Sequence, residues 1–171
     1  MGLEIKMDLF VVFFLKMKQI KLTQGKVSIV DDADHKYLSQ WKWCFEGRYA
    51  TRQPSRKLGK RKPIYMHRFI LNPSEGMEID HINRNKLDNR RSNLRICIHS
   101  QNLINRGIQK NNTSGYAGVT WYKPLKKWMA SIKVDGRFKN LGYFKNKEDA
   151  ILMRQKLAKL YYKDFFPQEV K

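Results

Sequence analysis

Four polar side chains near the middle of the sequence have types and spacing suited to the hydrolysis of a phosphodiester. Asp80 and His81 are adjacent; Asn93 follows His81 by twelve residues, and Asn102 follows Asn93 by nine. A carboxylate can bind a divalent cation, an imidazole can take a proton from water, and an amide oxygen can complete a metal site or hold a loop. Alone, an Asp-His pair is more often a turn ion pair, and a single asparagine is as often a turn or cap residue. The hypothesis of a hydrolytic site therefore rests on the four residues together.

Short strands and one short helix must bring these side chains together. The patterns predict strands at residues 64–71, 77–82 and 94–98, followed by a helix that is capped by Ser100 and stops at Gly107. Consecutive strand residues point to opposite faces, so Asp80 and His81 can share a site only if the strand ends or bends there. The polar residues 83–85 follow directly and favour such a loop. Asn102 is expected in the first turn of the helix, with Asn105 on the same face.

The whole chain is strongly basic. Its 171 residues include 35 Lys and Arg against 15 Asp and Glu, which gives a net charge of +20 and a pI near 10.1. The excess is +6 over residues 1–60, +6 over 61–110 and +8 over 111–171, so it belongs to folded modules rather than to one tail. Such modules release counterions from a polyanion, so the expected partner is a nucleic acid. The 42% hydrophobic content supports packed cores, and no basic amphipathic helix indicates a membrane surface.

The cysteines and the apolar N-terminal segment argue against other classes of protein. Cys44 and Cys97 are far apart and belong to no cluster of four ligands, so we expect no structural zinc. They are interpreted as buried thiols of a protein in a reducing cytosol. The apolar run at residues 9–15 is far shorter than the roughly 20 residues of a spanning helix, and no cleavage site follows it. We expect translation to start at Met17, which makes residues 1–16 an extension.

Residues 17–63 have the pattern of a small β-rich region. Apolar residues on both sides of Gly25 predict a hairpin, and the acidic run at 31–34 predicts the start of a short helix. Residues 41–51 are aromatic and strand-like. The basic segment 54–63 is predicted to be a loop that is either solvated or in contact with DNA.

A polar linker at residues 108–114 precedes a pattern of three strands and one helix. The predicted strands are 116–122, 128–134 and 138–144, and the helix runs from Asn146 to about Tyr162. An Asp-Gly pair at 135–136 predicts a tight hairpin. Alternation places Trp128, Ala130 and Ile132 against the helix. The outward face is then expected to carry Thr120, Tyr122, Met129, Ser131, Lys133, Phe138 and Asn140.

The central segment resembles the HNH endonuclease family over residues 64–107. The matching stretches are MHRFIL, EIDHIN, LDNRRSNLR and QNLINR. The resemblance implies a ββα-metal unit in which Asp80 and Asn102 bind the metal. His81 would be the general base, and Asn93 the residue that positions it. Asn102 replaces the usual final His, as in the HNN variants of phage and intron-encoded homing nucleases. Because this amide is neutral and donates oxygen, it favours Mg²⁺ or Mn²⁺ over zinc.

The same resemblance implies cleavage of DNA to 5′-phosphate and 3′-hydroxyl ends. One ββα site cuts one strand, so a monomer should nick, and a double-strand break requires two sites or a dimer. We expect a monomer or a weak dimer. The central residues expected to contact DNA phosphates are Arg68, Arg84, Arg90, Arg91, Arg95 and Arg106.

The C-terminal pattern resembles the AP2/ERF-like DNA-binding domain over residues 115–165. The resemblance is carried by GYAGV, WMASI and LGYF, and by Ala150 near the acidic start of the helix. It implies that the outward face of the sheet enters the major groove of DNA. Plant-type AP2 domains carry mostly Arg and Trp at several of these positions, so their target sequence does not transfer. The residues expected to contact DNA are Thr120, Tyr122, Lys123, Lys127, Ser131, Lys133 and Asn140, with Lys126 as a further phosphate contact.

Together these patterns predict an α+β protein. Its parts are a small β-rich region at 17–63, an HNH ββα-metal nuclease unit at 64–107 and an AP2-like three-stranded antiparallel sheet with one helix at 115–165. The expected function is a metal-dependent endonuclease that nicks double-stranded DNA and is directed by its C-terminal module. The main alternative is a sequence-specific DNA-binding regulator with an inactive nuclease unit. An RNA-binding protein is a third, weaker interpretation.

Overall fold

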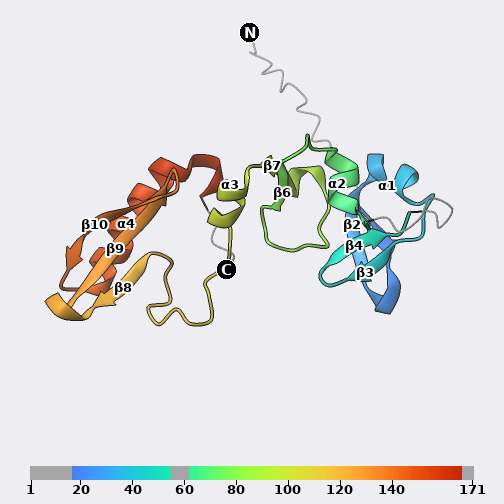
Figure 1. Ribbon diagram of the computed structural model, residues 1–171. Helices are drawn as coiled ribbons and strands as arrows, with labels where there is room; N and C mark the ends of the chain where they lie inside the picture. The colour runs from blue at the N-terminus through green and yellow to red at the C-terminus, as the bar shows by residue number, and fades with distance from the viewer. Residues whose placement is uncertain (1–16, 55–61, 167–171) are drawn as a thin grey trace, which may run out of the picture.

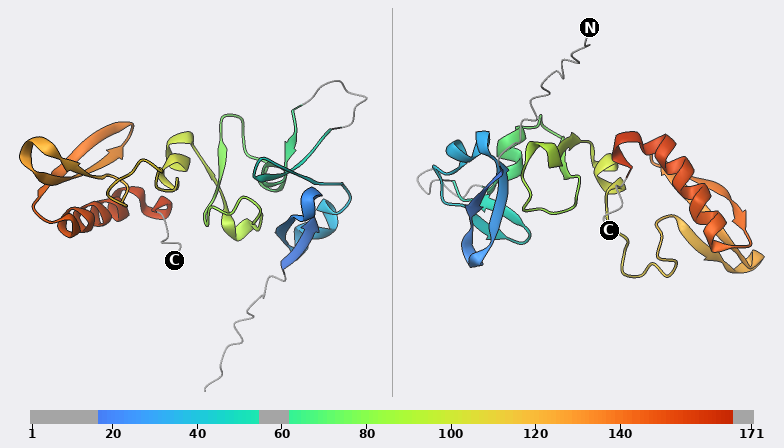
Figure 2. Two further views of the ribbon diagram at one scale, coloured as in Figure 1. Left: turned by 90° about the horizontal axis from the view of Figure 1, so that it is seen from below. Right: turned by 180° about the vertical axis from the view of Figure 1, so that it is seen from behind.

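The computed structural model describes residues 17–54 and 62–166, whose parts follow one another along an elongated molecule. Figures 1 and 2 show the N-terminal sheets at one end, the C-terminal sheet with helix α4 at the other, and β6, β7 and α3 between them. The expected extension at 1–16 and most of the predicted basic loop lie outside the described residues. Within the described part of the chain, no helix is long and apolar enough to cross a membrane.

Two small sheets and two helices form the N-terminal part. The elements are β1 (Met17–Lys21), β2 (Val27–Asp31), α1 (Asp32–Leu38), β3 (Cys44–Glu46), β4 (Tyr49–Arg52), β5 (Ile64–Tyr65) and α2 (Met66–Leu71). β1 and β2 form the predicted antiparallel hairpin, and its turn has positive φ angles at Gln24 and Gly25. β3, β4 and β5 form a second antiparallel sheet with β4 in the middle.

The predicted strand at residues 64–71 is wrong, because only its first two residues are extended and the chain then forms helix α2. The spacing of the buried residues explains the difference. Met66, His67 and Ile70 are buried, and they recur at helical intervals rather than at alternate positions. Asn72 then ends the helix in the left-handed conformation, with a φ of 42°. The helix therefore carries His67 into the interior of the protein.

One hydrophobic core joins the N-terminal part to the central unit. Its buried side chains come from both residues 17–63 and residues 64–107: Ile20, Leu22, Val30, Leu38, Trp43, Ala50, Met66, Ile70, Ile79 and Leu94. The backbone adds a second link. The Ile29 amide donates to the Leu87 carbonyl and the Ile29 carbonyl accepts from the Asn89 amide, both at 2.8 Å. Strand β2 therefore supports the loop that follows β6.

The central unit is an antiparallel pair of strands followed by a short helix: β6 (Glu78–His81), β7 (Leu94–Cys97) and α3 (His99–Ile104). In the pairing, Asp80 lies opposite Arg95 and His81 lies opposite Leu94. Strand β6 ends at His81, where a loop of residues 82–93 begins. The predicted strand and loop in this region are confirmed.

Helix α3 differs from the prediction at both ends. Ile98 rather than Ser100 is its N-cap residue, and its amide donates to the side-chain oxygen of Gln101 at 3.0 Å. The C-cap is Asn105, two residues before Gly107. The helix ends early because the Asn105 side chain is bonded to the end of β6.

The C-terminal part is the predicted three-stranded antiparallel sheet with one helix. Its elements are β8 (Val119–Tyr122), β9 (Lys127–Val134), β10 (Arg137–Phe144) and α4 (Lys147–Tyr162), with β9 in the middle of the sheet. Asp135 and Gly136 have the positive φ angles of a tight hairpin, and Asn146 is the N-cap of α4, both as predicted. The small core between sheet and helix is built from Val119, Ala130 and Ala150. One face of the sheet therefore packs on α4, and the other face is open.

Candidate active site

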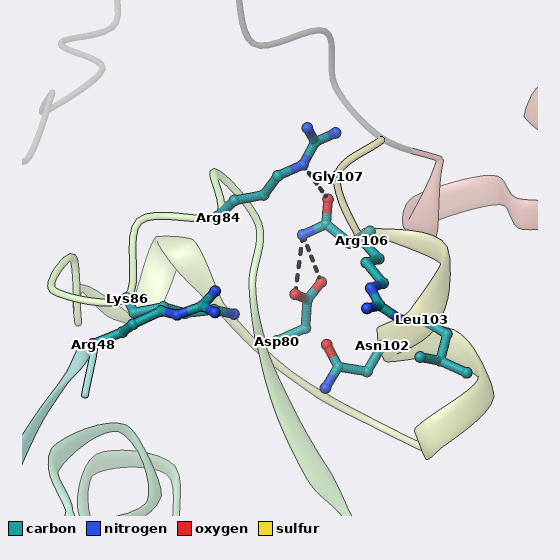
Figure 3. A pocket seen from close by; sticks show the side chains of 9 residues that line it. Arg48, Asp80, Arg84, Lys86, Asn102, Leu103, Arg106 and Gly107 are labelled. Atoms are coloured by element: carbon teal, nitrogen blue, oxygen red, sulfur yellow. Dashed lines mark hydrogen bonds between the residues drawn. The ribbon is translucent and has the colours of Figure 1, made fainter. Parts of the chain in front are cut away.

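A basic pocket of about 330 Å³ lies where the end of β6 meets α3. Its lining consists of Arg48, Asp80, Arg84, Lys86, Asn102, Leu103, Asn105, Arg106 and Gly107, among which Asp80 is the one acidic residue. Figure 3 shows Arg48 and Lys86 extending toward Asp80 from one side and Asn102 facing it from the other. Asp80 and Asn102, the two predicted metal ligands, therefore line the same pocket.

Asp80 is 1% exposed, and two neighbours fix its carboxylate. Arg95, which pairs with Asp80 across the strands, donates to Oδ2 from Nε at 2.9 Å and from Nη2 at 2.6 Å. Asn105 lies close to both carboxylate oxygens, with its Nδ2 at 2.9 Å from Oδ1 and 3.0 Å from Oδ2. The carboxylate is thus held rigidly and is partly neutralised by Arg95.

Asn105 is a site residue for which the sequence predicted only a position near Asn102. It is 4% exposed, and its Nδ2 also lies 2.9 Å from the His81 carbonyl and 3.2 Å from the Ile82 carbonyl. A single amide nitrogen therefore ties the end of α3 to the end of β6. The three-residue interval from Asn102 is the sequence signal that places both amides on one face of the helix.

Glu78 orients Asn102. Strand alternation puts Glu78 on the same face as Asp80, and its Oε2 accepts a hydrogen bond from Asn102 Nδ2 at 2.7 Å. The amide oxygen of Asn102 consequently faces Asp80 in the pocket (Figure 3). The hydrogen bonds from Asn102 and from His99 hold the pKa of Glu78 below its usual value. Glu78 is therefore an anionic acceptor at neutral pH, which is the form that fixes this amide.

The donor set of the pocket fits a hard cation. It offers one carboxylate and the amide oxygen of Asn102, and within the described residues no group of three or more His, Cys, Asp or Glu could hold a metal ion. Oxygen ligands in so small a number suit Mg²⁺ or Mn²⁺, which keep several waters and take further ligands from a phosphate. They do not suit zinc, which prefers four nitrogen and sulfur ligands.

His81 points to the other side of β6 and does not line the pocket. It is fully buried, and its ring centroid lies 5.2 Å from that of His67 and 6.2 Å from that of Tyr49. Asp80 and His81 are thus neighbours in the chain whose side chains lie on opposite sides of the strand, as alternation requires.

A chain of hydrogen bonds determines the tautomer of His81. The Ser28 hydroxyl donates to the Leu87 carbonyl at 3.0 Å, so it accepts from Asn89 Nδ2 at 2.8 Å. The other atom of this amide, Asn89 Oδ1, lies 3.2 Å from His81 Nε2. Because an amide oxygen can only accept, Nε2 carries the proton and Nδ1 carries the lone pair. Nδ1 is buried and has no hydrogen-bond partner among the described residues.

Burial keeps both interior histidines neutral. It lowers the pKa of His81 to about 4, and the charge of Lys86 acts in the same direction. It lowers the pKa of His67 to about 3, with a further contribution from His81. A neutral imidazole with an unpartnered lone pair is the chemical form of a general base.

Asn93 closes the loop between β6 and β7. Its Oδ1 accepts from the Asn83 amide at 2.9 Å, and its Nδ2 donates to the Asp88 carbonyl at 2.7 Å. The carboxylate of Asp88 is also buried and binds the side chains of Asn83 and Arg90. The loop that carries Asn89 to His81 is therefore held from within by polar side chains.

The comparisons with known proteins bear on this same segment. Residues 72–104 match the family model described as HNH endonuclease. Thus the central hairpin and helix are similar to an HNH endonuclease. Protein 3.8 of Escherichia phage T7 is 35% identical over 66 residues, which are 39% of this chain and 54% of that protein. The chain therefore spans about half of the length of this relative. No solved structure matches the chain.

In the segment that matches the HNH family model (residues 72–104, called the HNH segment below), three arginines already have a carboxylate partner. Arg90 binds Asp88 at 2.6 Å, Arg91 binds Asp34 at 2.8 Å, and Arg95 binds Asp80. Arg68 donates to the Met77 carbonyl at 3.2 Å. Of the arginines predicted to contact DNA, Arg84 and Arg106 line the pocket. Arg48 and Lys86 also line the pocket but were not predicted, because Arg48 lies before the matched segment and Lys86 lies between two of the stretches that carry the resemblance.

The open face of the C-terminal sheet is a second candidate surface. The strand register places on it all of the predicted residues, namely Thr120, Tyr122, Met129, Ser131, Lys133, Phe138 and Asn140, together with Lys127. A β-bulge after Asn140 adds Tyr143, whose ring lies 5.1 Å from that of Tyr122. Phe138 is 77% exposed, with Lys133 Nζ 5.5 Å from its ring. This face therefore combines exposed aromatic rings with positive charge.

Proposed function

We propose that this protein is a metal-dependent endonuclease that hydrolyses phosphodiester bonds of double-stranded DNA and nicks one strand at each site. The observation that carries the proposal is the meeting of Asp80 and Asn102 in one basic pocket, within the segment that matches the HNH endonuclease family. The net charge of +20 supports a nucleic-acid substrate.

Asp80 and Asn102 would hold Mg²⁺ or Mn²⁺. When bound, the ion would stabilise the negative charge that develops on the phosphate and on the leaving 3′-oxygen. Glu78 keeps the Asn102 oxygen turned into the pocket, and Arg95 with Asn105 keeps the Asp80 carboxylate in place. The positive side chains of Arg48 and Lys86 would attract the DNA backbone.

His81 would take the proton from the attacking water through Nδ1. The Asn89 bond supports this assignment because it leaves the lone pair on that atom. Since His81 is fully buried, the proposal requires its contacts with Tyr49 and His67 to open when DNA binds. Asn93 would position His81 by holding the loop closed at its base. The products would be 5′-phosphate and 3′-hydroxyl ends.

The C-terminal sheet would bind DNA in the manner of an AP2-like module and direct the nuclease to its site. Its open face, with Lys133 and Phe138, supports this role. The protein would act as a monomer or weak dimer in the cytosol of a bacterial or phage-infected cell.

A plasmid assay tests the proposal. Purified protein should convert supercoiled plasmids that carry candidate host loci to open circles with Mg²⁺ or Mn²⁺, and EDTA should stop the reaction. DNA ligase should reseal the nicks, because that enzyme requires 5′-phosphate and 3′-hydroxyl ends. Nicks that ligase cannot seal would contradict the proposed chemistry.

A second function is favoured by one observation. His81 does not line the pocket, and the charge of Asp80 is paired with Arg95. A sequence-specific DNA-binding regulator with an inactive nuclease unit would have this arrangement. It would shift DNA in a gel but would cleave none with any divalent metal.

A further inference from the structure

Three arginines line a second pocket, between α3 and the C-terminal part. The pocket has a volume of about 450 Å³. Arg84 comes from the loop after β6, Arg106 from the end of α3 and Arg154 from the middle of α4. None of the described residues that line it is acidic. The pocket therefore concentrates positive charge at a place where the HNH segment meets the C-terminal module.

The positive charge of Arg154 in this pocket has no carboxylate partner among the described residues. No described carboxylate lies within ion-pair distance of it, and Nε is buried without a hydrogen-bond partner. Its contacts are with Tyr162, whose hydroxyl lies 3.5 Å from Nη2 and whose ring centroid lies 5.3 Å from the guanidinium carbon. A guanidinium keeps its charge inside a protein, so a partly buried one without an anion is costly unless a ligand supplies the anion.

The backbone next to Arg154 is shaped to admit this side chain. A Cβ atom at Gly118 would lie 2.6 Å from Arg154 Nε and 2.4 Å from the Ser131 carbonyl oxygen. A side chain at residue 118 would therefore displace Arg154. Glycine also accepts the φ of +75° at this position. The arginine is thus built into the wall of the pocket and does not lie loosely on the surface.

We propose that this arginine pocket binds a phosphate of the DNA strand beside the bond that is cut. The inference rests on the proposed nuclease function and adds a binding site to it. Arg84 and Arg106 line both this pocket and the pocket of Asp80, so a strand in the active site can continue into the arginine pocket. Arginine suits the task because its planar fork matches phosphate oxygens.

Ala117 offers a test that leaves Arg154 intact. It lines the pocket and is exposed. Ala117→Glu supplies an internal anion, and Ala117→Gln is the matched control of the same shape. Lys156→Gln, on the exposed side of α4, removes the same amount of net charge outside the pocket. DNA binding is measured for the three full-length variants in EDTA across a range of salt concentrations, together with thermal melting.

The expected result is that Ala117→Glu binds DNA about tenfold more weakly than Ala117→Gln, with a salt slope smaller by about one. Its melting temperature should be no lower than that of the control, because the new carboxylate pairs with Arg154. Equal DNA affinity and equal salt slope for Ala117→Glu and Ala117→Gln would overturn the proposed phosphate site. An equal loss of DNA affinity in Lys156→Gln would do the same. Metal-dependent cleavage by the wild type reports separately on the nuclease, so the two proposals can fail independently.

Discussion

The HNH segment and the C-terminal sheet use polar and apolar groups in opposite ways. In the HNH segment the polar groups are inside: His81, Asn89 and Asn93 are at most 6% exposed and have hydrogen-bond partners. On the open face of the C-terminal sheet, aromatic groups are outside: Phe138 is 77% exposed beside Lys133. One region buries polar side chains that bind one another, whereas the other leaves aromatic rings exposed to solvent.

This difference assigns the two regions different tasks: the HNH segment holds side chains in a fixed geometry, and the sheet offers a surface to a partner. A buried polar network holds side chains in one geometry and is costly to break. An exposed aromatic face contributes little to folding and is available for a partner. Substitutions in the HNH segment should therefore change the chemistry and the stability, and substitutions on the sheet should change DNA binding alone.

The largest effect is expected from Asn89. Asn89→Leu removes the bond that fixes the His81 tautomer, and we expect cleavage at saturating DNA to slow by about 100-fold. The measurement is the single-turnover rate of cleavage of intact DNA that carries a cleavage site. Circular dichroism checks that the variant is folded. Ser28→Ala should slow cleavage less, because it removes the next link in the chain but leaves the Asn89–His81 bond. An unchanged rate in Asn89→Leu would show that cleavage does not depend on the hydrogen bond by which Asn89 fixes the tautomer of His81.

A carboxylate at the same position should shift the pH profile. Asn89→Asp places a negative charge beside His81 Nε2, which stabilises the protonated ring and raises its pKa from about 4. The base must be unprotonated, so the acid limb of the rate profile should move to higher pH. If the limb stays where it is in the wild type, the titrating base is not His81.

Glu78 comes next in expected size. Glu78→Ala frees the amide of Asn102, and we expect the Mn²⁺ concentration for half-maximal cleavage to rise by about 10- to 100-fold. His99→Ala removes the other hydrogen bond to Glu78 and serves as the control, with a much smaller rise. Equal metal requirements in the wild type and Glu78→Ala would show that Asn102 is not a ligand.

A smaller effect is expected on the sheet. Phe138→Ala should weaken DNA binding by about tenfold, with a change below about 0.5 kcal/mol in the free energy of unfolding, because the ring is exposed. Gel shifts and urea unfolding measure the two quantities. The single-turnover rate at saturating DNA should stay at the wild-type value; a loss of that rate would contradict the separation of the two regions.

The smallest effect near neutral pH concerns stability. The folded pKa values of His67 and His81 are about 3 and about 4, below the value of about 6.5 in an unfolded chain. Between about pH 4 and 6.5 the unfolded chain therefore binds protons that the folded protein does not, and stability falls as the pH is lowered. We expect uptake of about two protons on unfolding at pH 5, and about one in His67→Phe. Urea unfolding at several pH values gives these numbers.

The sequence predicted the C-terminal sheet almost completely. Alternating apolar residues, an Asp-Gly turn and an Asn cap are local signals, and each was found where it was expected. The strand predicted at 64–71 failed because a short, mostly apolar run between Pro63 and Asn72 fits a strand or a helix equally well. Tertiary packing of Met66 and Ile70 decides for the helix.

The site was predicted less completely because it depends on contacts between distant residues. The motif gave Asp80 and Asn102, which the structure brings into one pocket. Asn89 acquires its role from Ser28, which is 61 residues away, and Arg95 acquires its role from strand pairing. The pairing of Asn89 with Ser28 and that of Arg95 with Asp80 cannot be inferred from spacing in the sequence. The burial of His81 likewise follows from the packing of α2 and β4 around it.

The central claim is that the HNH segment cuts DNA and that His81 supplies the base. The most direct test compares the wild type with His81→Ala in the supercoiled plasmid assay with Mg²⁺, with DNA binding measured in EDTA. We predict metal-dependent nicking by the wild type and a rate at least about 100-fold lower in His81→Ala, with DNA affinity unchanged. Nicking at the wild-type rate by His81→Ala, or DNA binding without cleavage by the wild type, would contradict the account.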